Sequence, residues 1–473
     1  ALHGNHTIAA VNDCVAVGSQ AIGTGTLTAA ASGSVGIGHN ALKVLTSGAG
    51  NTAVGYNALA AETDGIGSVA VGYEALLTLT GIGGTAGNVA IGYRAGKLLA
   101  TGTGNIMLGY GAMDAADGSE TNMIAIGYNA LGNMNNNSSA SNIAIGAGAG
   151  DGIGTIAATN NIFVGVDAGG GIWTGATSTH NVGIGNSVMD AAMDGALGNI
   201  ALGAHALGSL TSGDNNIAIG TYDGTLPAAL QSNQAGSFCV AIGIGALANA
   251  NENDNDGTVA IGHLACKVQA GTGGAQFANA TTAVGYKALT ALTTGVSNTA
   301  VGYNALLTED AGGSNTAIGY QSLKICNNDS GGNTAVGKDT LVAVVAGYSN
   351  TAVGLGAGSS LVGGVSNVLI GRNAQASATG GVNQVVIGGV DTTGQGDNTV
   401  TLGNADVTKV YMASDRLAKV LLGNIEFPAT QSTSTNANTL DDYEEGYHTF
   451  VVDTDDDDAW DVRSGYQKGA YTK

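Results

Sequence analysis

The sequence is poor in proline, charge and aromatic side chains. Its 473 residues include only 2 Pro, 10% are charged and 5% are aromatic, whereas about a quarter of an average globular chain is charged. A collagen-like helix is excluded, because it needs abundant proline and glycine at every third position. A membrane-spanning helix is not expected, because Gly, Thr, Asn or Ser interrupts each apolar run well before about 18 residues.

Basic residues and cysteines are also scarce. The chain holds 14 Lys and Arg against 35 Asp and Glu, a net charge of −21. Such an acidic chain is not expected to bind nucleic acid through its phosphates. The four cysteines are far apart and form no CxxC pair, so we interpret them as small buried apolar residues rather than metal ligands. They are Cys14, Cys239, Cys266 and Cys326.

Glycine and a short repeated motif dominate what is present. The chain has 80 Gly and is 44% hydrophobic, a composition that argues against disorder. The string NTAVGYNAL occurs at 51–59 and again at 298–306, and looser versions fill most of the chain. Anchored on the Gly of the AVG or AIG core, 22 repeats follow one another, most often 17 residues apart. This pattern predicts an all-β parallel solenoid of about 22 coils.

The two positions that flank the middle of each motif are aliphatic or Thr. The residue before the anchor is always Val, Ile or Leu, and the residue three before it is always Val, Ile or Thr. Side chains two apart share one face of a strand, so we predict that this face is the core of each coil. The predicted core residues include Val54, Val71, Ile91, Val284, Val301 and Ile318.

The position between them is usually Ala and never charged. A strand face that met water would carry polar residues, so we expect this second face to be buried against other copies of the chain. Three chains around an axis leave no open side, which favours a homotrimer over a homodimer. Alanines that simply face solvent are the remaining alternative. The predicted trimer interface includes Ala53, Ala70, Ala90, Ala283, Ala300 and Ala317.

Polar and small residues mark the corners of the repeat. Asn stands four before the anchor in 13 repeats, a pattern that predicts a stacked amide ladder. The anchor glycine indicates a backbone with positive φ or a close approach between coils. Ala, often followed by Leu, recurs after the turn. We therefore expect two short strands, a tight glycine turn and one variable loop in each coil.

Tyrosine follows the anchor in eight repeats, which predicts two aromatic ladders. Such ladders bind sugars in some proteins, but they also stabilise neighbouring strands by about 0.5–1.5 kcal/mol per pair, and we favour this structural role. The ladder residues are Tyr56, Tyr73, Tyr93, Tyr110, Tyr128, Tyr286, Tyr303 and Tyr320. Five successive threonines share the face of the predicted core, which argues against an ice-binding surface. They are Thr282, Thr299, Thr316, Thr334 and Thr351.

Several strings resemble known families. SVAVG at 68–72, NVAIG at 88–92 and NIAIG at 142–146 resemble the core repeat of the left-handed parallel β-roll heads of trimeric autotransporter adhesins, over about residues 13–403. GNIEFPATQ at 423–431 and NANTLDDYEEG at 436–446 resemble segments near the ends of phage tail-fibre and other virion fibre proteins, and TVTLGNADVTKVYM at 399–412 resembles the coil before them. Together these resemblances imply a left-handed, trimeric phage fibre or spike.

Composition changes after the last repeat. We predict a solenoid over residues 1–403, a transition and capping segment over 404–430, and an acidic, aromatic β end domain over 431–473. A carboxylate cluster in the last segment suits Ca²⁺ by its ligand type, but the spacing of a calcium loop is missing, so a solvated acidic turn is favoured. Its members are Asp453, Asp455, Asp456, Asp457 and Asp458. No cofactor is expected.

Enzymatic activity is not expected from the sequence. A glycan-cleaving spike needs two carboxylates held across a groove, and the available pairs lie in variable loops: Glu62 with Asp64, Glu252 with Asp254, and Glu309 with Asp310. We instead expect a structural fibre of a phage virion that presents a distal surface to the host. Its expected partners are itself, other virion fibre or baseplate proteins, and a host surface glycan or protein, without membrane insertion. A bacterial cell-surface adhesin or extracellular filament is the alternative, and a glycan-degrading spike is less favoured.

Overall fold

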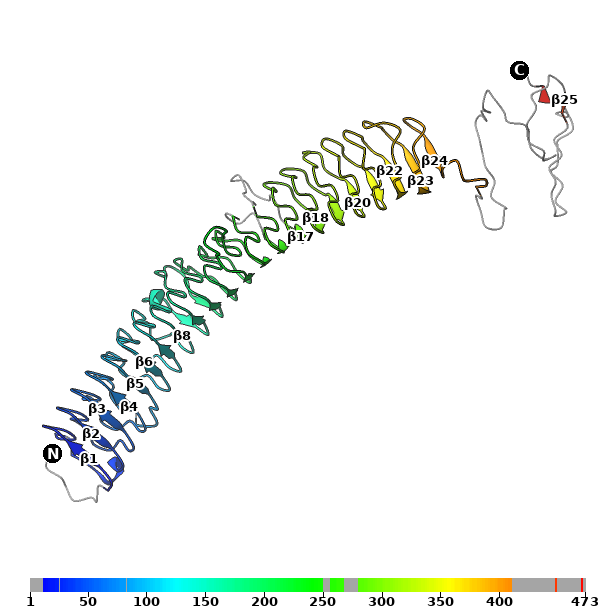
Figure 1. Ribbon diagram of the computed structural model, residues 1–473. Helices are drawn as coiled ribbons and strands as arrows, with labels where there is room; N and C mark the ends of the chain where they lie inside the picture. The colour runs from blue at the N-terminus through cyan, green and yellow to red at the C-terminus, as the bar shows by residue number, and fades with distance from the viewer. Residues whose placement is uncertain are drawn as a thin grey trace, which may run out of the picture. The chain divides into compact units, whose positions relative to one another are not determined.

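The computed structural model describes residues 12–24, 26–81, 83–249, 256–267 and 280–410, and two short strands beyond them. The chain divides into two compact units, Ala1–Thr408 and Lys409–Lys473. The first unit is a parallel β-solenoid whose coils contribute to one 22-stranded sheet (Figure 1). This confirms the predicted all-β solenoid and its number of repeats. In the described residues, no helix is long and apolar enough to cross a membrane.

One strand from each coil enters the main sheet. These strands are β1 (Val15–Val17), β2 (Val35–Ile37), β3 (Thr52–Val54), β4 (Val69–Val71), β5 (Val89–Ile91), β6 (Ile106–Leu108), β7 (Ile124–Ile126), β8 (Ile143–Ile145), β10 (Ile162–Val164), β12 (Val182–Ile184), β13 (Ile200–Leu202), β14 (Ile217–Ile219), β15 (Val240–Ile242), β16 (Val259–Ile261), β17 (Thr282–Val284), β18 (Thr299–Val301), β19 (Thr316–Ile318), β20 (Thr334–Val336), β21 (Thr351–Val353), β22 (Val368–Arg372), β23 (Val385–Val390) and β24 (Val400–Leu402). The other elements are β9 (Ala158–Thr159) and β11 (Ser178–Thr179), β25 (Tyr447–His448) and β26 (Gly469–Ala470), and the 3₁₀ turns η1 (Ala29–Ala31) and η2 (Asp151–Ile153).

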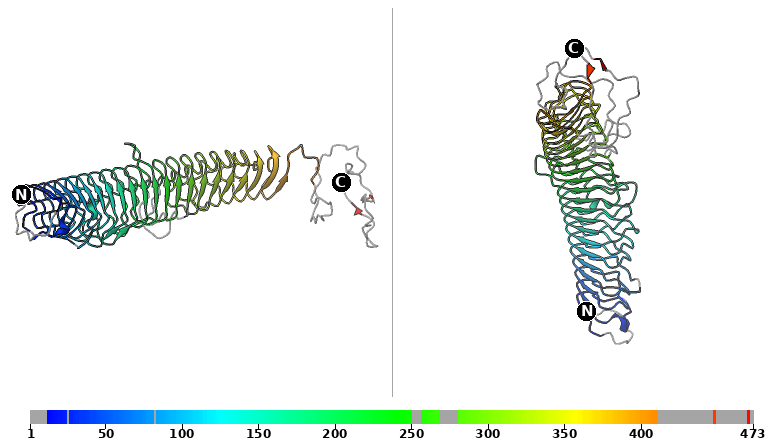
Figure 2. Two further views of the ribbon diagram at one scale, coloured as in Figure 1. Left: turned by 90° about the horizontal axis from the view of Figure 1, so that it is seen from below. Right: turned by 90° about the vertical axis from the view of Figure 1, so that its right-hand side faces the viewer.

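Every sheet strand pairs in parallel with the strand of the next coil. In β3 and β4, for example, Ala53 lies opposite Ala70 and Val54 lies opposite Val71. The strands lie side by side along one wall of the stack (Figures 1 and 2). Because this register is kept from coil to coil, each position of the motif becomes a column that runs along the solenoid.

The segment after the glycine turn is not a second strand in the typical coil. Asn57 and Leu59 have φ angles of 56° and 48°, in the left-handed region, which interrupts an extended chain. The coils still bond to one another here, since the Leu59 amide donates to the Ala75 carbonyl at 3.0 Å. The expectation of two strands per coil is therefore wrong for the typical coil, although β9 and β11 are second strands in two coils. The predicted inward position of Leu59 is confirmed.

The anchor glycine satisfies two constraints at once. Gly55 has a φ of 139°, and a Cβ built on it would collide with the carbonyl oxygen of Gly72 in the next coil. Gly302 repeats this arrangement with a φ of 141° and the carbonyl oxygen of Gly319 as its neighbour. Only glycine fits such a position without strain, which explains why the anchor never varies.

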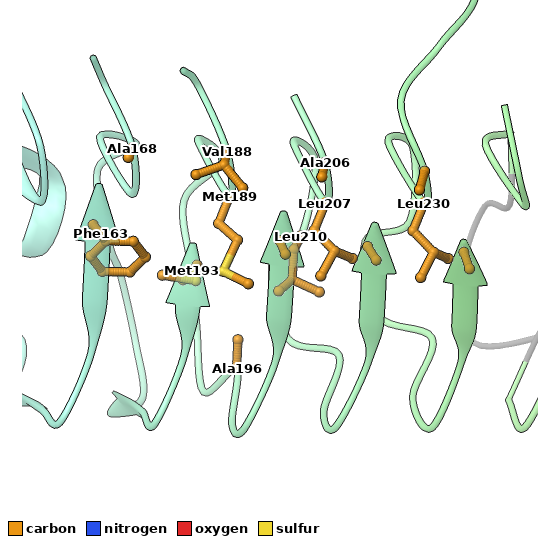
Figure 3. Packing of buried hydrophobic residues seen from close by; sticks show 14 of the residues in the cluster. Phe163, Ala168, Val188, Met189, Met193, Ala196, Ala206, Leu207, Leu210 and Leu230 are labelled. Atoms are coloured by element: carbon orange, nitrogen blue, oxygen red, sulfur yellow. The ribbon is translucent and has the colours of Figure 1, made fainter. Parts of the chain in front are cut away.

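The solenoid core is a thin layer between the sheet and the turns that follow it. Buried Leu and Met side chains from the turns point toward the middle residues of the strands (Figure 3). Where the middle residue is the large Phe163, the next coil has Gly183 in the same column. A Cβ on Gly183 would lie about 3.1 Å from the Phe163 ring, so a small neighbour makes room for the large one.

Candidate interaction surface

The structure reverses the predicted inner and outer faces of the strands. Ala53, Ala300 and the other middle alanines are fully buried within the single chain, so they cannot contact another chain. The flanking residues point outward, as Ile91 and Ile318 show, each with 40% of its surface exposed. The core assignment of Val54, Val71, Ile91, Val284, Val301 and Ile318 is therefore wrong. The trimer-interface assignment of Ala53, Ala70, Ala90, Ala283, Ala300 and Ala317 is wrong for the same reason.

Side-chain volume explains this reversal. The interior of a typical coil holds the middle strand residue together with a Leu from the following turn, such as Ala53 with Leu59. Protein interiors are close-packed, and extra methyl groups force neighbouring groups apart. Ala leaves room for the Leu, whereas Val or Ile fits better on the open outer side. Because both alternating sets are apolar, hydrophobicity alone did not separate them; residue size was the available signal.

The outward residues form an uncharged face along the whole sheet, which we call the aliphatic face. It consists of the first and third residues of each three-residue strand, or their equivalents in β22 and β23. Its most exposed large members are Val15, Val17, Ile37, Ile91, Ile106, Leu108, Ile145, Ile184, Ile200, Leu202, Ile318, Val353, Ile370, Ile387, Val400 and Leu402. An apolar patch of this extent marks an interaction surface in soluble proteins.

Threonine replaces the first aliphatic column in five successive strands, β17 to β21. Thr299 pairs with Thr316 in register, and the outward third residue remains Val301 or Ile318. These threonines lie on the outer side, because the alanine between the two outward positions is the buried one. The prediction that these threonines lie on the core face is therefore wrong, and it no longer argues against an ice-binding surface.

The tyrosines stack as two ladders. The first ladder is His39, Tyr56, Tyr73, Tyr93, Tyr110 and Tyr128, and the second is His263, Tyr286, Tyr303 and Tyr320. Ring centroids in the first ladder lie 4.9–5.3 Å apart, with planes tilted by no more than 13°. Each inner ring therefore covers the faces of its neighbours. Sugar binding by aromatic stacking needs an open ring face, so this geometry supports the structural role.

Charged side chains border the ladders. Arg94 bonds to Glu74 at 3.1 Å, and Lys97 lies 3.5 Å from the same carboxylate. The Arg94 guanidinium also lies 5.1 Å from the centre of the Tyr93 ring, and Lys287 lies 5.3 Å from that of Tyr286. These partly exposed pairs contribute little to stability individually. They place charged groups next to the ladders, whereas the aliphatic face carries no charged side chain.

The asparagine column is a buried amide ladder, as predicted. The Asn161 side chain donates to Asn142 Oδ1 at 3.1 Å, and Asn181 donates to Asn161 Oδ1 at 3.1 Å. Most of these side chains also donate to a main-chain carbonyl of the next coil, such as that of Ser178 for Asn161, at 3.0 Å. Buried polar groups need such partners, so the ladder fixes the loop of each coil to the strand of its neighbour.

Two of the loop carboxylates considered for catalysis are buried inside coils. Glu62 accepts a hydrogen bond from the Gly65 amide at 2.7 Å, and Glu309 accepts one from the Gly312 amide at 2.6 Å. Removal from water raises the pKa of Glu62 above its usual value. Both side chains close a loop within their own coil rather than facing a substrate groove. Glu252 and Asp254 lie outside the described residues.

Cysteine and metal chemistry find little support in the described part of the chain. Cys239, Cys266 and Cys326 are buried, as predicted, whereas Cys14 is half-buried. Burial raises the pKa of Cys239 and of Cys266 to about 12, so these thiols stay protonated and unreactive. No cluster of three or more metal-ligating side chains occurs among the described residues. The predicted acidic cluster, Asp453 to Asp458, lies outside them.

Comparison with known proteins adds no family assignment. No known family model matches the chain, and no curated protein sequence is similar to it.

Proposed function

We propose that this chain is the rod-forming subunit of an extracellular fibre, in which three copies assemble through the aliphatic face. The single observation that carries the proposal is this face: an uncharged, outward strip of Val, Ile, Leu and Thr in every strand of the main sheet. Water contact with so many apolar side chains is unfavourable by about 25 cal/mol per Å². A partner that covers the strip removes this contact.

Another copy of the chain is the partner that fits. The strip is two side chains wide and continues from β1 to β24, so a globular partner would leave most of it exposed. A second solenoid repeats with the same strand spacing of about 4.8 Å and matches it coil by coil. Each chain has a net charge of −21, so contact through an uncharged strip also minimises electrostatic repulsion between the chains. Three such strips close around an axis.

The virion setting rests on resemblance. The NVAIG-type repeats and the strings at 423–431 and 436–446 resemble trimeric bacterial adhesin heads and phage fibre ends, respectively. A stiff trimeric rod suits a tail fibre or spike that presents a distal surface to a host. Labelling of virions with an antibody against the solenoid tests this setting, and labelling of the bacterial surface alone would favour the adhesin alternative.

Sedimentation of surface variants tests the assembly. Val301→Lys with Ile318→Lys places two charges on the aliphatic face and is expected to convert a trimer into folded monomers. The matched control is Val345→Lys with Val362→Lys, which alters exposed aliphatic side chains, 42% and 41%, outside the main strands. The control is expected to remain trimeric. A parent protein that sediments as a monomer would exclude the proposed assembly.

A second candidate function is the binding of ordered water, including ice. The observation that favours it is the regular array of outward Thr and Val or Ile side chains on β17 to β21, since hydroxyl and methyl groups at strand spacing hold water in fixed positions. This function needs the face open to solvent. Inhibition of ice recrystallisation by the parent, lost in Thr316→Lys, would support it against the fibre.

A further inference from the structure

We propose that the two tyrosine ladders are seams between neighbouring chains, with a second copy of this chain as their partner. This inference rests on the proposed self-association. It adds the residues that join adjacent chains along one edge of the aliphatic face.

The ladders lie directly beside the aliphatic face. Tyr56 follows the outward residue Val54 across a single glycine, and Tyr303 follows Val301 in the same way. Both tyrosines expose 44% of their surface in the single chain. An assembly that covers Val54 and Val301 therefore brings the neighbouring chain up to these rings.

The stacked geometry leaves ring edges and hydroxyl groups to meet a partner. Tyr303 has Tyr286 on one face at 5.1 Å and Tyr320 on the other at 5.2 Å. A sugar that needs a ring face finds those of the inner rings occupied. Ring edges and phenol groups instead suit a protein surface that combines apolar contact with hydrogen-bond partners.

Across the ladder, the surface has the anatomy of a protein interface. The aliphatic face provides an apolar centre, and the tyrosines come next. Polar residues, such as Asn57, Glu74, Arg94 and Asn304, follow seven of the eight tyrosines in sequence. Protein interfaces commonly have an apolar core enriched in tyrosine and a polar rim. The order of these columns places the tyrosines at the margin of the buried centre.

Rotational symmetry supplies the opposing surface. When identical chains close around an axis, each chain contacts its neighbour through two different edges. The edge opposite the ladder is the first strand column, which is Thr282, Thr299 and Thr316 in the coils of the second ladder. Threonine hydroxyls then face phenol groups at the same coil spacing, and the ring edges contact threonine methyls.

Chemical nitration of tyrosine tests the seam on the unmodified, assembled chain. Tyr222 and Tyr348 are internal controls, because they expose 43% and 40% of their surface but belong to neither ladder. With tetranitromethane and peptide mass spectrometry, ladder tyrosines are expected to react several-fold more slowly than both controls. Ladder tyrosines that react as fast as the controls in a trimeric parent would overturn the seam while leaving the proposed assembly intact.

Variants provide a second measurement. The triple change of Tyr286, Tyr303 and Tyr320 to Lys is expected to raise the dissociation constant of the assembly at least about 30-fold, as loss of interface aromatic anchors does. The same tyrosines changed to Phe are expected to keep most of the affinity, and Tyr222→Lys with Tyr348→Lys is expected to keep all of it. Unchanged affinity of the folded triple Lys variant would contradict the proposal.

A glycan partner is a distinct outcome of the nitration test. If ladder tyrosines react freely in the trimer and become protected only after a bacterial surface polysaccharide is added, the ladders bind glycan and the seam is wrong. A monomeric parent would overturn the seam and the proposed function together.

Discussion

Each residue of the motif acts as a member of a column, because the parallel register places equivalent positions of successive coils in contact. The anchor glycines show this most clearly. Gly55 meets Gly72, and Gly302 meets Gly319, so one added methyl group disturbs two coils. The energetic effect of a substitution therefore depends on its column rather than on its place along the chain.

Alanine at an anchor glycine is expected to destabilise the solenoid. Gly302→Ala combines a positive φ with a backbone collision, and we expect a loss of about 2–4 kcal/mol in the free energy of unfolding. Gly67→Ala has a positive φ of 75° in open space, and Gly84→Ala has open space without that φ. Denaturant unfolding should show the largest loss in the free energy of unfolding for Gly302→Ala, a smaller loss for Gly67→Ala and the smallest for Gly84→Ala. Equal losses would refute the close-approach argument.

Two buried glutamates are expected to make stability depend on pH. Burial raises the pKa of Glu62 and the pKa of Glu120 above their ordinary values. The folded chain then keeps these protons at pH values where the unfolded chain has lost them, so the free energy of unfolding falls as pH rises from the ordinary glutamate value through the raised one. The Glu62→Gln, Glu120→Gln variant should show a shallower fall between about pH 4 and pH 7 in urea titrations. An identical slope in parent and variant would contradict this.

At the scale of the element, the coil is the unit of structure, and its neighbours complete it. Each strand has only three residues in most coils, too few for independent stability. Main-chain bonds between coils, the asparagine ladder and the Ala–Leu core all link a coil to the next. Repeat proteins of this kind owe their stability largely to nearest-neighbour contacts.

Removing one amide from the ladder is expected to loosen three coils. Asn350 donates to Asn333 Oδ1 at 3.1 Å and to the Gly364 carbonyl at 2.7 Å, and it accepts from Asn367. Asn350→Ala leaves buried groups unpaired, and we expect a loss of about 2–4 kcal/mol. The control is half-buried Asn136, whose side-chain bond to the Thr155 carbonyl is exposed to solvent, with an expected loss below about 1 kcal/mol. Faster hydrogen exchange at Asn367 and Gly364 reports the effect locally.

Overpacking the middle column is expected to unfold coils without touching the outer face. Ala317 is fully buried beside leucines of the turns, so Ala317→Leu should lower stability by about 1–3 kcal/mol or more. Ile318→Leu, on the outside of the same strand, should change stability by less than about 0.5 kcal/mol. Thermal unfolding of both variants separates the faces. Equal destabilisation would contradict the observed burial pattern.

The columns allowed much of this element to be predicted from sequence. The number of coils, the amide ladder, the tyrosine stacks and the anchor glycine all follow from residues that recur at one position. The direction of Ala53 and Val54 did not follow, because alternation gives two faces and both are apolar; the narrow coil interior decides between them. The single strand per coil was also missed, since left-handed φ values at Asn57 and Leu59 have no clear sequence signal in Leu.

At the scale of the whole molecule, the reversal of the strand faces changes which residues form the expected interface, but an interface is still expected. An uncharged side still needs a partner, and it is now the larger Val, Ile and Leu side chains that need covering. The tyrosine ladders border this side and extend the expected contact to its margin. The fibre and adhesin candidates both place other copies of the chain against the aliphatic face, whereas the ordered-water candidate leaves this face open to solvent.

A cross-section of the purified protein by electron cryomicroscopy distinguishes the proposed trimer from a single solenoid. We expect three solenoids around one axis, with Val301 and Ile318 of each chain at the centre and Ala300 and Ala317 enclosed within each coil. The tyrosine ladders should lie where adjacent chains meet. A single solenoid with its aliphatic face open to solvent, or an assembly joined through another side, would contradict the proposed trimer.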